Sequence, residues 1–124
     1  MATIGDFPAS ASITVELRRT PTVCLVRVVG DIDIDGVEPM RAALSEAART
    51  GTPVVLDCTE TTFADSSFLN TALHALRSVP VHLAGATGML ASLLKVTGTD
   101  EVFRLHPDVA TALRECARQE EGAS

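Results

Sequence analysis

The chain has 124 residues, of which 46% are apolar and 21% are charged, and its formal net charge is −6. This length and apolar fraction predict one folded domain with its own core and exclude an intrinsically disordered chain. No stretch approaches the ~18 consecutive apolar residues of a membrane-spanning helix. The acidic balance argues against nucleic acid as a partner and for a partner with a basic surface.

The cysteines and the first residues favour a cytoplasmic protein. Cys24, Cys58 and Cys116 are far apart in the sequence and include no C-x-x-C pair. This usage predicts buried, reduced thiols rather than disulfides. Residues 1–11 lack the basic segment followed by an apolar one that marks a secretory signal.

The first half of the chain predicts a β-hairpin followed by a helix. Apolar and polar residues alternate over residues 12–18, and a β-branched run fills residues 23–29, with a turn at 19–22 between them. After a loop at 30–36, apolar residues recur at helical spacing as far as Gly51. Asp35 and Glu38 resemble a capping box that would begin this helix.

The second half predicts alternating strands and helices. The expected elements are a buried strand at 53–58, a loop at 59–62, a helix at 66–78, a strand at 79–84, a helix around 90–94, a loop at 97–100, an edge strand at 102–105 and a last helix from Pro107. The fold class is therefore α/β, with a mixed sheet of four to five strands packed with about four helices. We expect one domain over residues 12–118, a flexible leader at 1–11 and a flexible tail at 119–124.

Residue patterns typical of enzymes are weak in this chain. His74, His82 and His106 share no metal-ligand spacing, so no metal or cofactor site is expected. Ser66 and Ser67 lie between a strand and a helix, but the glycines of a G-x-S-x-G nucleophile elbow are missing. A turn from Gly85 to Gly88 matches neither the phosphate-binding P-loop nor the dinucleotide-binding pattern.

The segment 54–75 carries the strongest functional signal. Asp65, Ser66 and Ser67 follow a buried strand and a loop, and they lie where the helix at 66–78 begins. One interpretation is a helix cap, which stabilises a helix by about 1 kcal/mol. The other is a phosphorylation switch, because a helix N-terminus can hold a phosphate and the added charge would change partner binding. This second interpretation requires that the hydroxyl be reachable from solvent.

Three segments, in order and spacing, resemble anti-sigma factor antagonists of the STAS-domain family. The residues GDID at 30–33 are similar to that family's G-[ED]-[IL]-D segment. The residues VVLD at 54–57 and FADSS at 63–67 are similar to its V-x-L-D and F-x-D-S-S signature. Residues 81–103 resemble its C-terminal half. The resemblance covers most of the chain and implies a STAS-like fold.

The resemblance also implies a function and site residues. In this family, the unphosphorylated antagonist binds an anti-sigma factor that is also a serine kinase, which releases the sigma factor. Phosphorylation by that kinase inactivates the antagonist, and a metal-dependent Ser/Thr phosphatase restores it. By position, Ser67 is the phosphoacceptor, Asp33 is an acidic loop residue that contacts the kinase, Asp65 orients the helix start and Ser66 can cap it. The protein would be a cytoplasmic monomer without catalytic activity.

Phe68 departs from the family pattern, which commonly has a small residue after the serine pair. Phe68 lies off the predicted apolar stripe of Leu69, Ala72, Leu73 and Leu76, so partial exposure is expected. It would then be an aromatic anchor for a partner, a hindrance to a kinase, or a residue that packs over a neighbouring loop. Two alternatives to the antagonist hypothesis stay open. One is a STAS-fold scaffold or sensor that binds protein or a small ligand without phosphorylation, and the other is a small enzyme.

Overall fold

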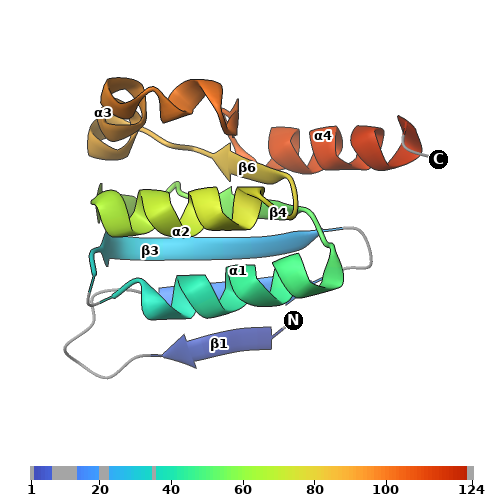
Figure 1. Ribbon diagram of the computed structural model, residues 1–124, viewed down its shortest axis with the longest axis horizontal. Coiled ribbons are helices and arrows are strands. Elements are labelled where there is room, and N and C mark those ends of the chain that lie inside the picture. The colour runs from blue at the N-terminus through green and yellow to red at the C-terminus, as the bar shows by residue number, and fades with distance from the viewer. Residues whose placement is uncertain (1, 7–13, 20–22, 35, 123–124) are drawn as a thin grey trace.

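A mixed β-sheet with helices on both faces forms the molecule (Figure 1). The computed structural model describes residues 2–6, 14–19, 23–34 and 36–122, and the side chains of 23–34 and 36–118. The strands are β1 (Ala2–Asp6), β2 (Thr14–Arg19), β3 (Cys24–Ile32), β4 (Val54–Asp57), β5 (Thr61–Ala64), β6 (Val81–Ala84) and β7 (Arg104–His106). The helices are α1 (Glu38–Thr50), α2 (Ser66–Leu76), α3 (Gly88–Thr97) and α4 (Val109–Gly122), with a short 3-10 helix η1 (Thr99–Glu101).

The sheet follows the order β1-β2-β3-β4-β6-β7, and β5 pairs with β3 beyond the end of β4. The pairs β1–β2 and β2–β3 are antiparallel, whereas β3–β4, β3–β5, β4–β6 and β6–β7 are parallel. The predicted hairpin and the mixed α/β architecture are confirmed. The hairpin turn at 20–22 lies outside the described residues.

Two strands were not expected, so the described sheet has seven strands rather than four to five. β1 lies within the expected leader at 1–11, and its residues 2–6 pair with β2; residues 7–11 lie outside the described part. β5 replaces much of the expected loop at 59–62, because the backbone of Gly30, Asp31 and Ile32 offers this segment a parallel partner. At the other end, α4 continues through residues 119–122 of the expected tail.

The start of α1 also differs from the expected capping box. The N-cap is Val37, whose side chain makes no capping hydrogen bond, and Asp35 lies outside the described residues. A proline in the first turn is compatible with a helix, because a first-turn N–H has no intrahelical partner. The helix ends at Gly51, as predicted.

Alternate residues of the central strands divide the core into two parts. On one face, Val54 and Leu56 pack with residues of α1, α2 and α3. On the other face, Val55 packs with Ala112 and Cys116 of α4. The three apolar residues of β4 are fully buried, which confirms the predicted strand with cover on both faces.

The burial of the cysteines and the character of the described helices match what the sequence predicted. Cys24, Cys58 and Cys116 are buried thiols that form no disulfide, as predicted. Burial raises the pKa of the Cys58 thiol to about 12, because the thiolate would lose its hydration. In the described part of the chain, no helix has the length and apolarity that a membrane crossing requires.

Candidate functional site: the N-terminus of helix α2

The predicted site forms where β5 passes into α2. Asp65 is the N-cap of α2, and its Oδ1 accepts a hydrogen bond from the backbone N–H of Ser67 at 2.8 Å. The backbone N–H of Asp65 donates to the carbonyl of Ile32 at 3.3 Å, which fastens the helix start to the end of β3. Asp65 therefore caps the helix, and the expectation that Ser66 caps it is wrong, because Ser66 is already the first helical residue.

The two serines differ in exposure. Ser66 is exposed and Ser67 is half-buried. Both belong to the first turn of α2, and Ser67, although half-buried, keeps part of its surface open to solvent. A phosphate on Ser67 would share the helix start with the Asp65 carboxylate, which already occupies the N–H of Ser67.

Phe68 requires a correction. The structure buries it completely, with 0% of its surface exposed, among the core residues of α2. Positions 68, 72 and 75 share one helix face because they are four and then three residues apart. Phe68, Ala72 and Ala75 thus form the inward face beside Leu69, whereas Leu73 and Leu76 are only partly buried. A buried ring is not an exposed partner anchor, so packing is the role that Phe68 has here.

Asp33 lies in the turn between β3 and α1, on the same sheet edge as Asp65. Its Oδ1 accepts a hydrogen bond from the backbone N–H of Gly36 at 3.0 Å, and its side chain is half-buried. Ile32 and Ala64, which precede the two aspartates, are register partners in the parallel β3–β5 pair. This pairing brings the Asp33 turn and the start of α2 together.

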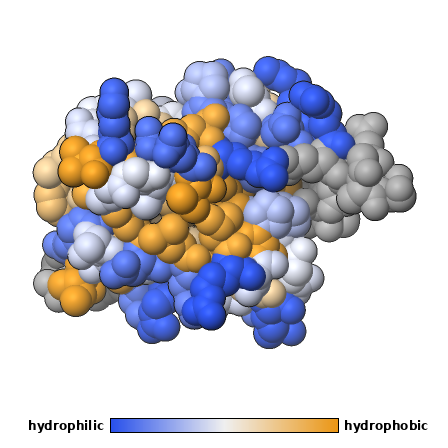
Figure 2. Space-filling view, turned by 45° about the horizontal axis from the view of Figure 1, so that its top comes forward, coloured by the Kyte–Doolittle hydropathy of each residue, from blue (hydrophilic) through white to orange (hydrophobic). Residues whose placement is uncertain are grey.

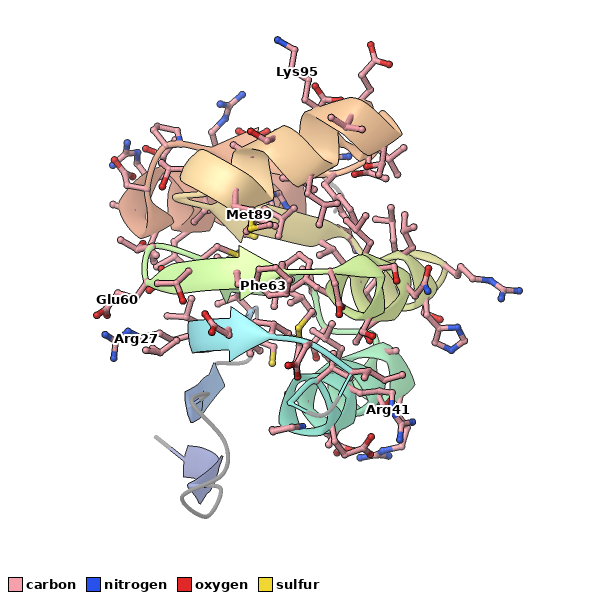
Figure 3. The ribbon with its side chains drawn as sticks, turned by 90° about the vertical axis from the view of Figure 1, so that its left-hand side faces the viewer. Arg27, Arg41, Glu60, Phe63, Met89 and Lys95 are labelled. Carbon is pink, nitrogen blue, oxygen red and sulfur yellow. The ribbon has the colours of Figure 1, made fainter. Side chains whose placement is uncertain are left out.

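Two exposed apolar residues near this edge, Ile34 and Met89, were not singled out from the sequence, whereas Phe63 is the first residue of the FADSS segment. Ile34 is 75% exposed and follows Asp33, and Met89 is 54% exposed in the first turn of α3. Phe63 is half-buried on β5, against which α3 lies, and Figure 3 shows Phe63 and Met89 close together on one side of the molecule. Isoleucine between two aspartates, in the DIDID segment, was the available sequence signal for Ile34.

Figure 2 shows an apolar band bordered by hydrophilic side chains on one face of the molecule. Leu73 and Leu76 of α2 and Leu93 of α3 are partly buried apolar residues. The Asp31 carboxylate is exposed and accepts a hydrogen bond from Thr62 Oγ1 at 2.5 Å, across the β3–β5 pair. Asp31, Asp33 and Asp65 thus give this edge a negative charge.

No metal centre is found among the residues that the structure describes. Within that part of the chain, no three His, Cys, Asp or Glu side chains could hold a metal ion together. His82 and His106 contact each other, whereas His74 lies on α2.

This fold and helix-start geometry define the STAS class of α/β domains. The family model described as "Mlab, STAS domain" matches residues 15–115, so the chain belongs to this STAS family. An anti-sigma factor antagonist from Mycobacterium paratuberculosis is similar, with a TM-score of 0.78, 21% identity and coverage of 86% of this chain and 95% of that chain.

Two solved forms of the antagonist SpoIIAA are also similar. The unphosphorylated form has a TM-score of 0.71 at 19% identity and covers 82% of this chain and 95% of its own. The phosphorylated form, from Bacillus, has a TM-score of 0.65 at 19% identity and covers 82% of this chain and 98% of its own. At these identities the likeness establishes the fold.

Proposed function

We propose that this protein is an anti-sigma factor antagonist that binds its anti-sigma factor when unphosphorylated and is switched off by phosphorylation of Ser67. The observation that carries the proposal is the position of Ser67: the residue is half-buried in the first turn of α2, and its backbone N–H donates to the capping carboxylate of Asp65. Membership of the STAS family and the similarity to solved antagonists support it.

The docking face comprises the turn after β3, the start of α2 and the start of α3. Ile34 and Met89 supply exposed apolar area, and Asp33 and Asp65 supply negative charge. Such a surface complements an apolar patch that has basic residues at its rim. Burial of Ile34 and Met89 would contribute affinity, and the aspartates would favour fast association with a basic partner.

Phosphorylation would oppose docking where the partner's apolar patch, rather than its basic rim, covers the start of α2. A phosphoserine adds about −1.5 to −2 charges, and Asp65 next to it already carries one. A partner that covers this edge would have to desolvate the new charge. A penalty of about 3 kcal/mol would weaken binding roughly a hundredfold, at 1.4 kcal/mol for each factor of ten.

The proposed cycle needs two partners and no catalysis by this chain. An anti-sigma factor with serine-kinase activity would both bind and phosphorylate it, and a metal-dependent Ser/Thr phosphatase would restore it. We place the cycle in the cytoplasm, with this protein as a monomer. Neither nucleic acid nor a membrane is a partner in this scheme.

The test combines modification with binding. The protein is incubated with Mg-ATP and a purified anti-sigma factor kinase from its own organism, and the modified residue is mapped by mass spectrometry. We expect modification at Ser67, loss of modification in Ser67→Ala, and full modification in Ser66→Ala. If Ser67→Ala is modified as completely as the unchanged protein, the assigned switch is wrong.

Calorimetry then measures affinity for the anti-sigma factor. Ser67→Asp is expected to bind at least tenfold more weakly than Ser67→Ala, and Ser66→Asp serves as the matched control for a charge one position away. Equal affinities of Ser67→Asp and Ser67→Ala would contradict the electrostatic switch.

One surface feature favours the alternative function of a ligand-binding sensor. A groove of about 560 Å³ runs between α1 and α2. Its floor includes Leu44, Ala48 and Ala75, and polar side chains such as Ser45 and His74 line it. A sensor would bind its ligand there and show no modification by the kinase, so the same phosphorylation experiment separates the two functions.

A further inference from the structure

Two histidines from neighbouring strands form a hydrogen-bonded pair. His82 of β6 is fully buried, and its Nδ1 lies 2.9 Å from Nε2 of the partly buried His106 of β7. The ring centroids are 5.1 Å apart and the planes differ by 22°, so the rings also stack. The two residues are 24 positions apart in the sequence, which makes the pair a tertiary contact.

The pair connects the last strand and helix to the interior of the sheet. β7 has three residues, and α4 begins three positions after His106. The carbonyl of His106 also accepts a hydrogen bond from Gly85 N–H at 3.0 Å. Because β7 pairs with no strand other than β6 in the described chain, these contacts hold a short edge segment in place.

Proton counting makes this contact sensitive to acid. A hydrogen bond between two ring nitrogens requires that one of them carry a proton and the other carry none. The intact pair can therefore hold one positive charge but not two, because two imidazolium rings would direct N–H groups at each other across 2.9 Å. We propose that the His82–His106 pair is an acid-sensitive clasp, which holds β7 and the start of α4 on the sheet at neutral pH and releases them at acidic pH.

The surrounding charges do not remove this limit. From β4, the residues on the same face are Val55, which is apolar, and the half-buried Asp57. The other titratable or charged groups near the pair are Arg104 of β7, Asp108 before α4, and Arg114, Glu115 and Cys116 of α4. Lys95 of α3 and Asp100 of η1 line a cavity together with His106. The carboxylates favour the first positive charge on the pair, and the arginines and Lys95 disfavour it. None of these groups relieves the conflict between two facing N–H groups.

Linkage gives the sign and size of the effect. In the unfolded chain both histidines gain protons near the ordinary pKa of about 6.5. The intact pair accepts at most one, so below this pH the unfolded or locally opened state binds at least one more proton. The stability of β7 and the start of α4 then decreases as pH falls. For each extra proton bound by the open state, the ratio of the closed to the open population falls by up to tenfold per pH unit.

The test follows the ring nitrogens and the backbone amides by NMR. Between pH 8.0 and 5.0 we expect the ring nitrogen signals of His82 and His106 to change together, as the pair takes up one proton between them. Between pH 7.0 and 5.0, the hydrogen-exchange protection factors of amides in β7 and in the first turn of α4 should fall at least tenfold. The protection factors of β4 amides should not fall to this extent. These rates are corrected for the intrinsic pH dependence of exchange.

Two variants complete the test. His74→Gln, which alters a histidine outside the pair, should keep the acid-induced loss, and His82→Gln should remove it, because a single histidine carries no two-proton conflict. The proposal fails if both rings of the unchanged protein each gain a full proton with protection intact, or if His82→Gln loses as much protection as the unchanged protein does. If His82→Gln does not fold, the ring titration of the unchanged protein decides.

Discussion

The carboxylate of Asp65 binds the backbone N–H of Ser67, the residue whose hydroxyl is the proposed phosphoacceptor. The backbone carbonyl of Asp65 also accepts from Phe68 N–H at 3.1 Å, so one residue fixes the first turn of α2. The position of the Ser67 hydroxyl thus depends on Asp65 even where no partner is bound.

Loss of this cap should destabilise the protein. We expect Asp65→Ala to lower the free energy of unfolding by about 1 kcal/mol, the usual effect of removing an N-cap side chain. Asp65→Asn keeps a side-chain oxygen acceptor, so its free energy of unfolding should fall by only a few tenths of a kcal/mol. Urea denaturation of the three proteins measures the difference, and equal stability of Asp65→Ala and the unchanged protein would contradict the capping role.

Gly85 and Gly51 allow steric crowding to be separated from backbone strain. Both have a left-handed backbone, with φ of +74° and +73°. A Cβ at Gly85 would lie 2.7 Å from Thr59 Oγ1 and 3.3 Å from Thr59 Cα, whereas a Cβ at Gly51 would meet nothing within 4 Å. Thr59 cannot easily move, because its hydroxyl donates to Asp57 at 2.5 Å.

We therefore expect alanine to be worse at position 85 than at position 51. Gly51→Ala should cost about 1 kcal/mol, from the left-handed conformation alone. Gly85→Ala should cost a further ~1–3 kcal/mol from overpacking against Thr59. Thermal and urea unfolding give both values, and similar losses in the two variants would show that the contact with Thr59 is relaxed without cost.

Phe68 and Phe63 should respond differently to truncation. Phe68→Ala removes a ring that is 0% exposed and should cost ~3–5 kcal/mol of stability. Phe63 is half-buried on β5, so Phe63→Ala should cost about 1 kcal/mol. Phe63 lies close to Met89 of the proposed docking face (Figure 3), so Phe63→Ala should lower affinity for the anti-sigma factor while the protein stays folded. An unchanged affinity would exclude Phe63 from that face.

The Cys58 thiol predicts a loss of stability at alkaline pH. Its pKa rises from the ordinary 9.0 to about 12 in the folded protein, mainly through burial. Above pH 9 the unfolded state releases this proton while the folded state keeps it, so stability is complete below pH 9 and decreases from there to about pH 12.

The measurement compares Cys58→Ala with the unchanged protein. Between pH 8.5 and 10.5 the stability of the unchanged protein should fall more steeply, by up to about 1.4 kcal/mol per pH unit from this group. A thiol reagent at pH 8 should modify none of the three cysteines quickly in the folded protein and all of them in urea. Rapid labelling of Cys58 without denaturant would contradict its burial.

Residue patterns over short stretches of sequence predicted many of the strands and helices. Alternation predicted β2, the β-branched run predicted β3, and the apolar run at 54–56 predicted a strand with cover on both faces. The start of α2 at Ser66 also follows from its neighbours, since Asp65 is a strong N-cap residue. These features depend on residues within a few positions of one another.

The missed features depend on distant partners. β5 has only four residues, TTFA, and becomes a strand because the end of β3 offers it hydrogen bonds. Phe68 faces the core because α2 packs with the side of the helix that carries Phe68, Leu69, Ala72 and Ala75 against the sheet. Leu73 and Leu76 of the predicted stripe lie at the border of this side and are only partly buried. The His82–His106 pair requires the β6–β7 register, in which Ala84 is opposite His106, and no local pattern encodes that register.

The length of β3 has one more consequence. Its first residues, from Cys24 to Arg27, hold β4, and its last, from Gly30 to Ile32, hold β5. Because β4 and β5 both pair with β3, the distance between the end of β4 and the start of β5 is fixed. The connection between them therefore cannot gain or lose residues freely. In homologous chains we expect length variation to concentrate elsewhere, so that the distance from Asp57 to Asp65 stays constant while surface loops differ.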